Sequence, residues 1–446
     1  MFKKVLIANR GEIALRIIRA CKEMGLNTVA VYSEIDRDCL HVHMADEAIC
    51  IGPADSSKSY LNIKNIISAA IISGAEAIHP GYGFLSENPK FARVCKLQGL
   101  KLIGPSEENI RKMGNKSEAR RTMVEAGIPV VPGTKDVTIN ADKGLKLAKE
   151  IGFPVIIKAS SGGGGRGMRI VYSEKEFTDA FNTAKSESAV AFNDDSMYIE
   201  KYIEEPRHIE FQILADEYGN ILHLGERDCS LQRRNQKVLE EAPCSIIDSP
   251  LREKMGEMAV KAAKTVNYVG AGTIEFLLDR YNNFYFIEMN TRIQVEHPVT
   301  EVITGIDLIK EQIKIAKGEE LKFTQDDIKI SGHAIECRIN AEDPNKSFRP
   351  SPGTVEHYFV PGGNGVRVDS HIYSGYRIPP TYDSMIGKLI AWGKNREEAI
   401  ARTRRALDEM IITGINTNID FHRKILDNKK FLENQINTSF IEKEIM

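Results

Sequence analysis

The acidic and amide residues best placed for chemistry lie on two apolar segments in the second half of the chain. Glu275 sits in GTIEFLL, and Glu288 and Asn290 lie two positions apart in FYFIEMN. Side chains two apart in a strand point to the same face, so Glu288 and Asn290 are expected side by side. Hard oxygen ligands of this kind suit Mg²⁺ or Mn²⁺ when phosphate oxygens complete the shell. Alternating carboxylates more often mark a solvated strand face, but the apolar neighbours Phe276 and Phe286 argue against that alternative.

A second polar group follows directly after these residues. Arg292, Gln294 and Glu296 recur at intervals of two, so in an extended segment they would point into one space. A guanidinium group can bind a planar oxyanion through two hydrogen bonds, an amide can orient it, and a carboxylate can take its proton. The segment is therefore predicted to bind an oxyanion such as bicarbonate, with a solvated polar strand as the alternative. His297, which precedes Pro298, is expected to be structural.

A glycine run lies between two strand-like stretches, PVIIKA and MRIVY. Gly162, Gly164 and Gly167 match G-x-G-x-x-G, but a strand follows them, so no helix N-terminus is available to bind a pyrophosphate. The absence of a following Gly-Lys-Ser/Thr excludes a Walker A loop. We expect a hairpin whose glycine tip closes over a nucleotide while Lys158 neutralises phosphate charge. A plain disordered turn is the alternative.

The elements that must position these residues begin with alternating strands and helices, which predicts a doubly wound parallel sheet. In the helix expected over 12–24, Ile13, Ile17 and Cys21 form one buried stripe, and Gly25 is placed to end it. The strands expected here are 4–8, 28–32, 47–51, 77–79 and 100–103, and the other helices are 61–73, 89–97 and 107–126.

From residue 154 onward antiparallel strands predominate, which indicates an α+β region, and Gly219-Asn220 is a turn signal between two of them. The strands expected are 154–159, 168–172, 197–202, 209–215, 221–226, 273–278 and 284–290, and the helices are 175–186 and 251–265. Past about Leu321, Pro/Gly-rich strands such as 332–339 lead to helices 396–411 and 418–426.

Composition excludes several classes of protein. With 446 residues, 42% hydrophobic and 27% charged, the chain suits two to four globular domains. No apolar run approaches the roughly 18 residues needed to cross a bilayer, so no membrane association is expected. A net charge of −2 without a long basic tract argues against nucleic-acid binding. The seven cysteines form no CxxC or zinc spacing, which is typical of reduced thiols in the cytoplasm.

The glycine hairpin resembles that of the ATP-grasp biotin carboxylases, and so do further motifs in the same order along nearly the whole chain. These are IANRGEIALRIIRA, HPGYGFLSEN, IIKASSGGGGRGM, GERDCSLQRRNQKVLEEAP, FIEMNTRIQVEHPVTE, ECRINAEDP and YDSMIGKLI. Long co-linear matches are far more specific than a single short motif. The resemblance implies an ATP-grasp fold of mixed α/β and α+β class. Its expected parts are an N-terminal doubly wound domain (1–113), an ATP-grasp domain (114–330) with a glycine-lid subdomain (130–203), and a C-terminal mixed α/β domain (331–446).

The resemblance also implies roles for individual residues. Arg292, Gln294 and Val295 are expected to hold bicarbonate, Glu296 to act as general base, and Lys237 to meet the transferred phosphoryl group. Arg338 is expected to stabilise the ureido oxygen of biotin, with a surface ion pair to Glu336 or Glu342 as the alternative. The metal ligands are Glu275, Glu288 and Asn290. The residues implied in nucleotide binding are Lys116, Lys158, Gly164, Gly165, Glu200, Lys201, Ile203, His208 and Asn235.

Two positions, Asn235 and Asn364, qualify the resemblance. Asn235 stands where the family usually has a histidine, and an amide cannot carry charge, which weakens that expected ATP contact. Arg16 and Asp383 resemble a family pair that links the first and last domains near the dimer interface. Asn364 stands where several relatives carry an aromatic residue, which weakens the expected homodimer contact.

The function implied is ATP-dependent carboxylation of biotin on a biotin carboxyl carrier protein, with bicarbonate as substrate. Expected cofactors are ATP, two Mg²⁺ or Mn²⁺ ions, and carrier-bound biotin. Carboxyltransferase subunits are expected partners, within an acetyl-CoA carboxylase of fatty acid synthesis. A component of a pyruvate or other acyl-CoA carboxylase is an alternative. Another ATP-grasp ligase, such as a purine-pathway carboxylase or a carbamoyl-phosphate synthetase half, and a non-catalytic nucleotide-binding regulator are less consistent with the full motif set.

Overall fold

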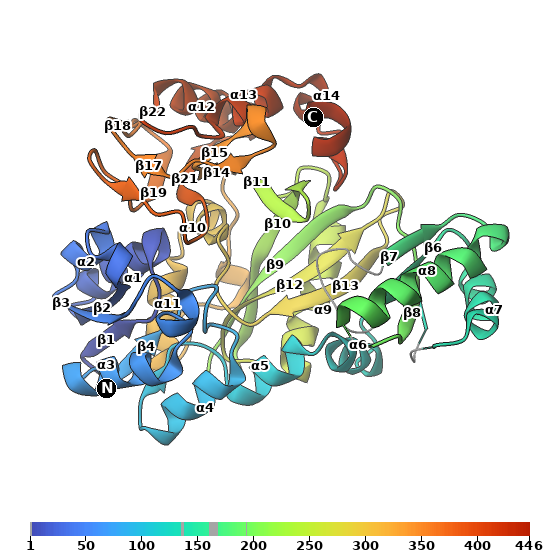
Figure 1. Cartoon of the computed structure of the whole chain (residues 1–446), viewed down its shortest axis with the longest axis horizontal. Coiled ribbons are helices and arrows are strands. Elements are labelled where there is room, and N and C mark those ends of the chain that lie inside the picture. The colour runs from blue at the N-terminus through green and yellow to red at the C-terminus, as the bar shows by residue number, and fades with distance from the viewer. Residues whose placement is uncertain (1, 135–137, 160–167, 193) are drawn as a thin grey trace. The chain divides into compact units, whose positions relative to one another are not determined.

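The computed structural model describes residues 2–134, 138–159, 168–192 and 194–446 (Figure 1). By its internal contacts the chain divides into two compact units. The first unit consists of Met1–Ala119, His208–Glu275 and Glu288–Met446, and the second of Arg120–Arg207 and Phe276–Ile287.

The first unit opens with a five-stranded parallel sheet in the order β3-β2-β1-β4-β5. Its strands are β1 (Lys4–Ile7), β2 (Asn27–Ser33), β3 (Glu47–Gly52), β4 (Ala77–His79) and β5 (Lys101–Leu102). Its helices are α1 (Gly11–Glu23), α2 (Leu40–Met44), α3 (Ile63–Ser73) and α4 (Pro89–Leu97), with one-turn helices at Glu34–Asp36 and Ser56–Lys58. The predicted doubly wound parallel sheet is confirmed.

Helix α1 shows why the repeat of apolar residues predicted this helix correctly. Ile13, Ile17 and Cys21 are each no more than 2% exposed, which places the predicted stripe in the core. Gly25 follows the helix with a φ of +68°, a left-handed conformation that a residue without Cβ adopts without strain.

The helix predicted over 107–126 is wrong as a single element. The structure has two helices there, α5 (Glu107–Gly114) and α6 (Lys116–Glu125). Asn115 between them is extended, and its side chain accepts the Glu118 amide at 3.0 Å. Asn115 therefore caps the second helix, because a short amide side chain satisfies the free N–H groups of a helix start.

An eight-stranded sheet in the order β13-β12-β9-β10-β11-β14-β21-β19 lies mostly in the first unit, and its residues 207, 276–278 and 284–287 belong to the second. Its strands are β9 (Arg207–Ala215), β10 (Ile221–Arg233), β11 (Gln236–Ala242), β12 (Gly270–Leu278), β13 (Phe284–Asn290), β14 (His333–Asn340), β19 (Val366–Ser370) and β21 (Met385–Gly393). Strands β11, β19 and β21 were not among the predicted strands. Helix α12 packs on β14 and β21, as Figure 1 shows.

The remaining helices and short strands of this unit complete its core. The helices are α9 (Ser249–Thr265), α10 (His297–Thr304), α11 (Leu308–Ala316), α12 (Arg396–Glu409), α13 (Ile419–Asp427) and α14 (Lys429–Leu432), with shorter helical turns at Gln325–Asp327, Pro344–Lys346 and Ile441–Ile445. Two-residue strands pair as β15 (Glu342–Asp343) with β16 (Arg349–Pro350), β17 (Gly353–Thr354) with β20 (Arg377–Ile378), and β18 (Tyr358–Phe359) with β22 (Ile411–Ile412).

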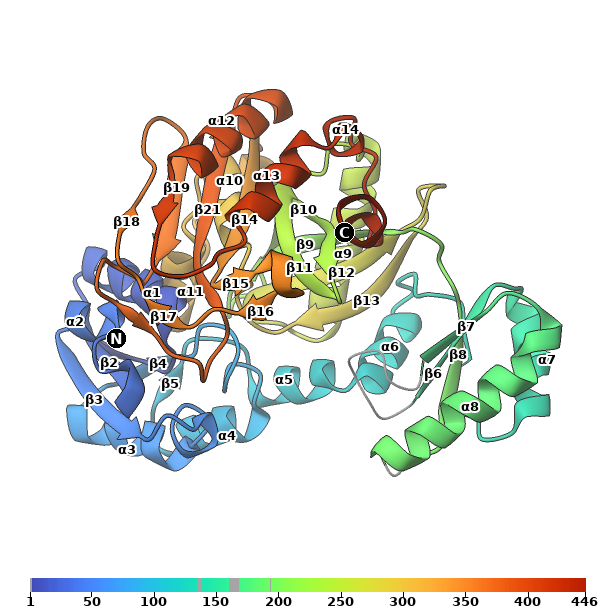
Figure 2. The same cartoon turned by 45° about the horizontal axis from the view of Figure 1, so that its top comes forward.

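The second unit is built on a three-stranded antiparallel sheet in the order β7-β6-β8 (Figure 2). Its strands are β6 (Val155–Ala159), β7 (Met168–Val171) and β8 (Met197–Lys201), and helices α7 (Ala141–Ile151) and α8 (Glu174–Phe192) pack on them. Lys158 pairs in register with Met168, so the strands that flank the glycine run form the predicted hairpin arms. Within the described residues, no helix combines the length and apolarity needed to cross a membrane.

Candidate active site

Lys237 is the centre of a buried charge cluster in the first unit. Its Nζ lies 2.5 Å from Oε2 of Glu210, 3.1 Å from Oε1 of Glu275 and 2.7 Å from Oε1 of Glu296. These carboxylates come from β9, β12 and the residue before α10, while Lys237 comes from β11. The sheet and one loop therefore bring four separate segments of the chain to a single point.

The charges in this cluster reinforce one another. Burial favours the neutral form of Lys237, but the three carboxylates outweigh it and raise the pKa of the ammonium group well above its usual value. Burial likewise opposes ionisation of Glu296, but Lys237, Arg338 and Arg227 lower the pKa of its carboxyl group. Lys237 and Glu296 are therefore both ionised at neutral pH.

Arg292 and Gln294 lie at the edge of this cluster. The Nε of Arg292 donates to Glu87 at 2.9 Å, and its Nη2 donates to Oδ1 of Asn290 at 2.9 Å. The amide of Gln294 donates to Oε1 of Glu275 at 3.0 Å. The oxyanion-binding and metal-binding residues of the sequence prediction are thus neighbours through direct hydrogen bonds.

The extended segment predicted over Arg292, Gln294 and Glu296 is wrong as a strand. Strand β13 ends at Asn290, and Glu296 has a φ of −80° and a ψ of 10° as the residue that precedes α10. Pro298 in the first turn explains this helix start, because proline lacks the N–H that a helix start leaves unpaired. The three side chains lie in one region because of the tertiary fold, and not because they alternate along a strand.

His297 is fully buried beside this loop, as expected of a structural residue. Its Nδ1 lies 2.7 Å from the carbonyl oxygen of Gln294. Burial lowers the pKa of the imidazole well below its usual value, so the ring is neutral and donates its single proton from Nδ1.

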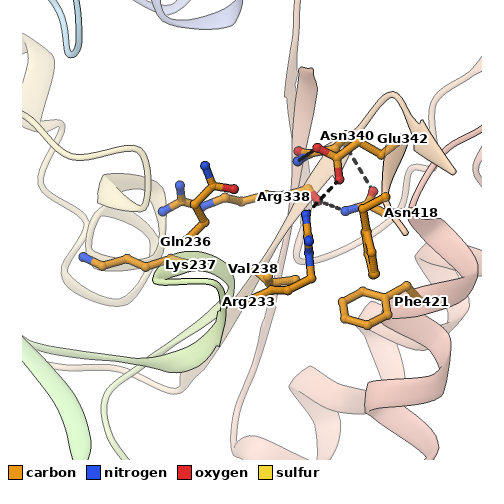
Figure 3. Close-up of a pocket in the computed structure, with 10 residues that line it drawn as sticks. Arg233, Gln236, Lys237, Val238, Arg338, Asn340, Glu342, Asn418 and Phe421 are labelled. Atoms are coloured by element: carbon orange, nitrogen blue, oxygen red, sulfur yellow. Dashed lines mark hydrogen bonds and ion pairs between the residues drawn. The ribbon is translucent and has the colours of Figure 1, made fainter. Parts of the chain in front are cut away.

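Arg338, on β14, connects two carboxylates. Its Nη2 lies 2.6 Å from Glu240 and 3.0 Å from Oε2 of Glu296. The surface ion pair with Glu336 or Glu342 that the sequence left open is therefore not what the structure has. Figure 3 shows Lys237 and Arg338 projecting to the same side from neighbouring strands. The pocket beside them is lined by Arg233, Gln236, Lys237, Val238, Arg338, Asn340, Glu342, Phe348, Asn418 and Phe421.

The residues predicted to hold a metal fit a hard cation. Glu275 and Asn290 lie on neighbouring strands, and the Asn290 amide donates to Oε1 of Glu275 at 2.9 Å. Glu288 keeps 35% of its side chain exposed, with its Oε2 3.4 Å from the Nζ of Lys116. Oxygen donors with one open carboxylate suit Mg²⁺ or Mn²⁺ that shares its shell with phosphate. Among the described residues, His208, Glu210 and Glu275 also bring ligand atoms within 4.8 Å of one another.

The residues predicted to bind nucleotide are divided between the two units. In the second unit, the Nζ of Lys158 lies 2.6 Å from Glu200, and Lys201 donates to the carbonyl oxygens of Gly152 and Phe153 at 3.0 and 2.9 Å. Ile203 follows β8 and is partly exposed. Gly164 and Gly165 lie outside the described residues.

In the first unit, the nucleotide-binding predictions fall on three residues. Lys116 has 80% of its side chain exposed. The Nε2 of His208 lies 3.1 Å from Glu275. Asn235 is exposed in the two-residue turn between β10 and β11, with φ of +51° at Arg234 and +63° at Asn235. Asparagine adopts this left-handed conformation readily, so turn geometry explains the residue type at 235.

The sequence prediction missed Glu210 and Arg227. Both are 0% exposed, and Arg227 donates to Glu210, Gln212 and Thr300. Arg227 thus holds the carboxylate that contacts Lys237. Alternation along the strand could have indicated Glu210, because it lies two positions from His208 and shares a strand face with it.

Within one chain, the structure does not pair Arg16 with Asp383. Arg16 instead forms ion pairs with Glu301 at 2.9 Å and Asp307 at 2.6 Å. Asp383 accepts the Met385 amide at 2.8 Å. A spacing of 367 positions could not show which carboxylate the fold brings to Arg16.

Three family models match the chain in succession. They are "Biotin carboxylase, N-terminal domain" over residues 1–110, "Carbamoyl-phosphate synthase L chain, ATP binding domain" over 115–324, and "Biotin carboxylase C-terminal domain" over 336–443. A biotin carboxylase from Nostoc is 62% identical over 99% of this chain and 99% of its own. The chain belongs to the biotin carboxylase family.

Two further relatives of this biotin carboxylase chain carry different names. The crystal structure of a biotin carboxylase from Campylobacter jejuni matches with a TM-score of 0.94 and 52% identity, and the match covers 100% of this chain and 99% of that one. A pyruvate carboxylase subunit from Methanothermobacter thermautotrophicus is 57% identical over 99% of this chain and 90% of its own. The protein is accordingly an enzyme, an ATP-dependent ligase with the ATP-grasp fold.

Proposed function

We propose that the chain carboxylates biotin attached to a biotin carboxyl carrier protein, consuming ATP and bicarbonate and releasing ADP and phosphate. The observation that carries this proposal is the position of Glu296 between two cations. Lys237 lies 2.7 Å from one of its carboxylate oxygens, and Arg338 lies 3.0 Å from the other. One carboxylate thus adjoins both the lysine suited to a phosphoryl group and the arginine suited to a ureido oxygen.

The first step activates bicarbonate. Arg292, Gln294 and the Val295 main chain would hold the anion, and Glu296 would accept its proton as a bicarbonate oxygen attacks the γ-phosphorus of ATP. ADP leaves as the P–O bond to the β-phosphate breaks, and carboxyphosphate forms. Lys237 would turn from the carboxylates to the phosphoryl group, and the pKa of Glu296 would then rise towards proton acceptance.

Charge stabilisation supplies most of the catalysis in such a phosphoryl transfer. A divalent metal ion held by Glu275, Glu288 and Asn290 would neutralise phosphate charge. Its donor set suits Mg²⁺ or Mn²⁺, and two ions fit the family resemblance. The residues that would contact the nucleotide are Lys116, Lys158, Gly164, Gly165, Glu200, Lys201, Ile203, His208 and Asn235.

The second step moves the carboxyl group to biotin. The C–O bond of carboxyphosphate breaks to give CO₂ and phosphate, and the phosphate takes the proton of biotin N1′. N1′ then attacks CO₂, while Arg338 stabilises the negative charge that develops on the ureido oxygen. The pocket next to Arg338 offers space on that side of the guanidinium group.

The test is bicarbonate-dependent hydrolysis of ATP by the purified full chain in the presence of free biotin and Mg²⁺. We expect ADP release that requires both bicarbonate and biotin. Hydrolysis that is absent, or equal with and without bicarbonate, would contradict the proposal.

The larger assembly is proposed from the relatives. The chain would act as a homodimer together with a carrier protein and the carboxyltransferase subunits of an acetyl-CoA carboxylase. This enzyme would be cytoplasmic and would serve fatty acid synthesis. The 57% identity with a pyruvate carboxylase subunit favours a second candidate, in which pyruvate or another acyl-CoA is the acceptor. Reconstitution with each set of carrier and transferase subunits, followed by assay of the carboxylated acceptor, distinguishes the two.

A further inference from the structure

Lys388 is a fully buried lysine on β21, in the YDSMIGKLI segment, and the proposed chemistry gives it no role. It lies opposite Arg338 of β14 and Asp369 of β19 in the sheet register. A buried ammonium group is costly unless it is paired and hydrogen-bonded. Its partners therefore indicate why the fold tolerates it.

The Nζ of Lys388 makes two contacts that join distant segments. It donates to the carbonyl oxygen of Val295 at 2.8 Å, and it lies 3.1 Å from Oε1 of Glu12 in α1. Glu12 is 4% exposed, and its Oε1 also accepts the hydroxyl proton of Tyr82. Lys388 thus connects a carboxylate of the N-terminal sheet region with the main chain next to Glu296.

The ammonium group stays charged in this position. Burial opposes the charge, but Glu12, Glu336 and Asp369 outweigh it and raise the pKa of Lys388, while Arg367 acts against them. The donor that Val295 receives is therefore a full cation, which makes the hydrogen bond short and directional.

This bond determines how the peptide between Val295 and Glu296 is oriented. In a trans peptide the carbonyl and the following N–H point in opposite directions, so fixing the Val295 carbonyl also fixes the Glu296 N–H. His297 holds the preceding carbonyl, that of Gln294, at 2.7 Å. The buried side chains of His297 and Lys388 thus hold the consecutive carbonyl groups of Gln294 and Val295.

We propose that Lys388, with Glu12 as its counter-ion, is a positioning residue that presents the Val295–Glu296 peptide to bicarbonate. The inference rests on the proposed function, because it deepens the bicarbonate site. A buried ion pair contributes little to net stability when hydrophobic residues of similar volume can replace it. The hydrogen bond from Lys388 to the Val295 carbonyl gives the Glu12–Lys388 pair a role in positioning the loop, which is separate from any effect on stability.

The decisive variant is the double substitution Glu12→Gln/Lys388→Met, which removes both charges and leaves neither carboxylate nor ammonium unpaired. We expect it to unfold near the wild-type temperature but to raise the KM for bicarbonate on the order of 10- to 100-fold, with the KM for ATP unchanged. The matched control is Glu226→Gln/Arg252→Met, which removes a different ion pair, with a buried carboxylate, a partly buried guanidinium group and contacts of 2.7–3.0 Å. The control should keep the wild-type KM for bicarbonate.

A folded double variant with the wild-type KM for bicarbonate would overturn the inference. If Lys388→Met proteins do not fold even with Glu12→Gln, Glu12→Gln alone carries the test, since it leaves Lys388 without its counter-ion. A raised bicarbonate KM in that variant supports the positioning role, and a wild-type value overturns it. A wild-type enzyme without bicarbonate-dependent ATP hydrolysis would instead refute the proposed function itself.

Discussion

Lys237 Nζ lies 2.7 Å from Oε1 of Glu296, although the two residues are 59 positions apart in the sequence. Lys237 has 12% of its side chain exposed and Glu296 has none, so water screens this pair weakly. Each residue therefore holds the other in its charged form, and substrate binding at this point must compete with a strong existing contact.

Lys237→Met tests the phosphoryl-transfer role. The change leaves Glu210, Glu275 and Glu296 without their shared cation, and we expect kcat for bicarbonate-dependent ATP hydrolysis to fall roughly 10²- to 10³-fold. The matched control is Lys261→Met on the exposed face of α9, which should keep wild-type kcat. A Lys237→Met enzyme with more than a tenth of wild-type kcat would remove Lys237 from the mechanism.

Arg338→Gln tests the electrostatic link to Glu296 through pH. Burial opposes the ionisation of Glu296, while Lys237 and then Arg338 lower its pKa. Loss of Arg338 raises that pKa, so the proton acceptor is neutralised at a higher pH. We expect the acid limb of kcat/KM for bicarbonate to move to higher pH in Arg338→Gln and less in Arg338→Lys, which keeps the positive charge. An unmoved limb in Arg338→Gln would show that the two groups are not coupled.

Glu288→Gln tests the metal site. Removal of a carboxylate ligand weakens the attraction for a divalent cation, and we expect half-maximal activation to require roughly 10- to 100-fold more Mg²⁺. Activity should recover at high Mg²⁺. Glu257→Gln, an exposed change on α9, serves as the control. Identical Mg²⁺ titrations for Glu288→Gln and wild type would argue against Glu288 as a ligand.

Glu240→Gln tests a buried acid by its effect on stability. Burial raises the pKa of Glu240 from 4.5 to about 7, against the opposing effect of Arg338. Between pH 4.5 and 7 the folded protein keeps a proton that the unfolded chain has lost, so wild-type stability falls as pH rises through this window. The variant lacks this titration. The difference in free energy of unfolding, variant minus wild type, should therefore increase from pH 4.5 to 7 when both proteins are unfolded in urea. Parallel curves across the window would contradict the raised pKa.

Local patterns in the sequence determined the secondary structure where one physical rule dominated. The stripe of Ile13, Ile17 and Cys21 predicted α1, because a 3.6-residue repeat buries one face of a helix. The segment 284–290 was predicted with the bounds that β13 has. The pattern failed at Asn115, where a side-chain cap begins a new helix within an otherwise continuous helical stretch.

The sequence by itself determined which residue types could hold a metal, a phosphate and an oxyanion, because spacing and chemistry are local properties. The tertiary structure alone decided which charges meet. Glu210 and Arg227 had no distinguishing local pattern beyond alternation, and Arg16 has partners nearly 300 positions away. Lys388 reaches Val295 across 93 positions. Such contacts depend on strand order and register, which a sequence without its fold does not specify.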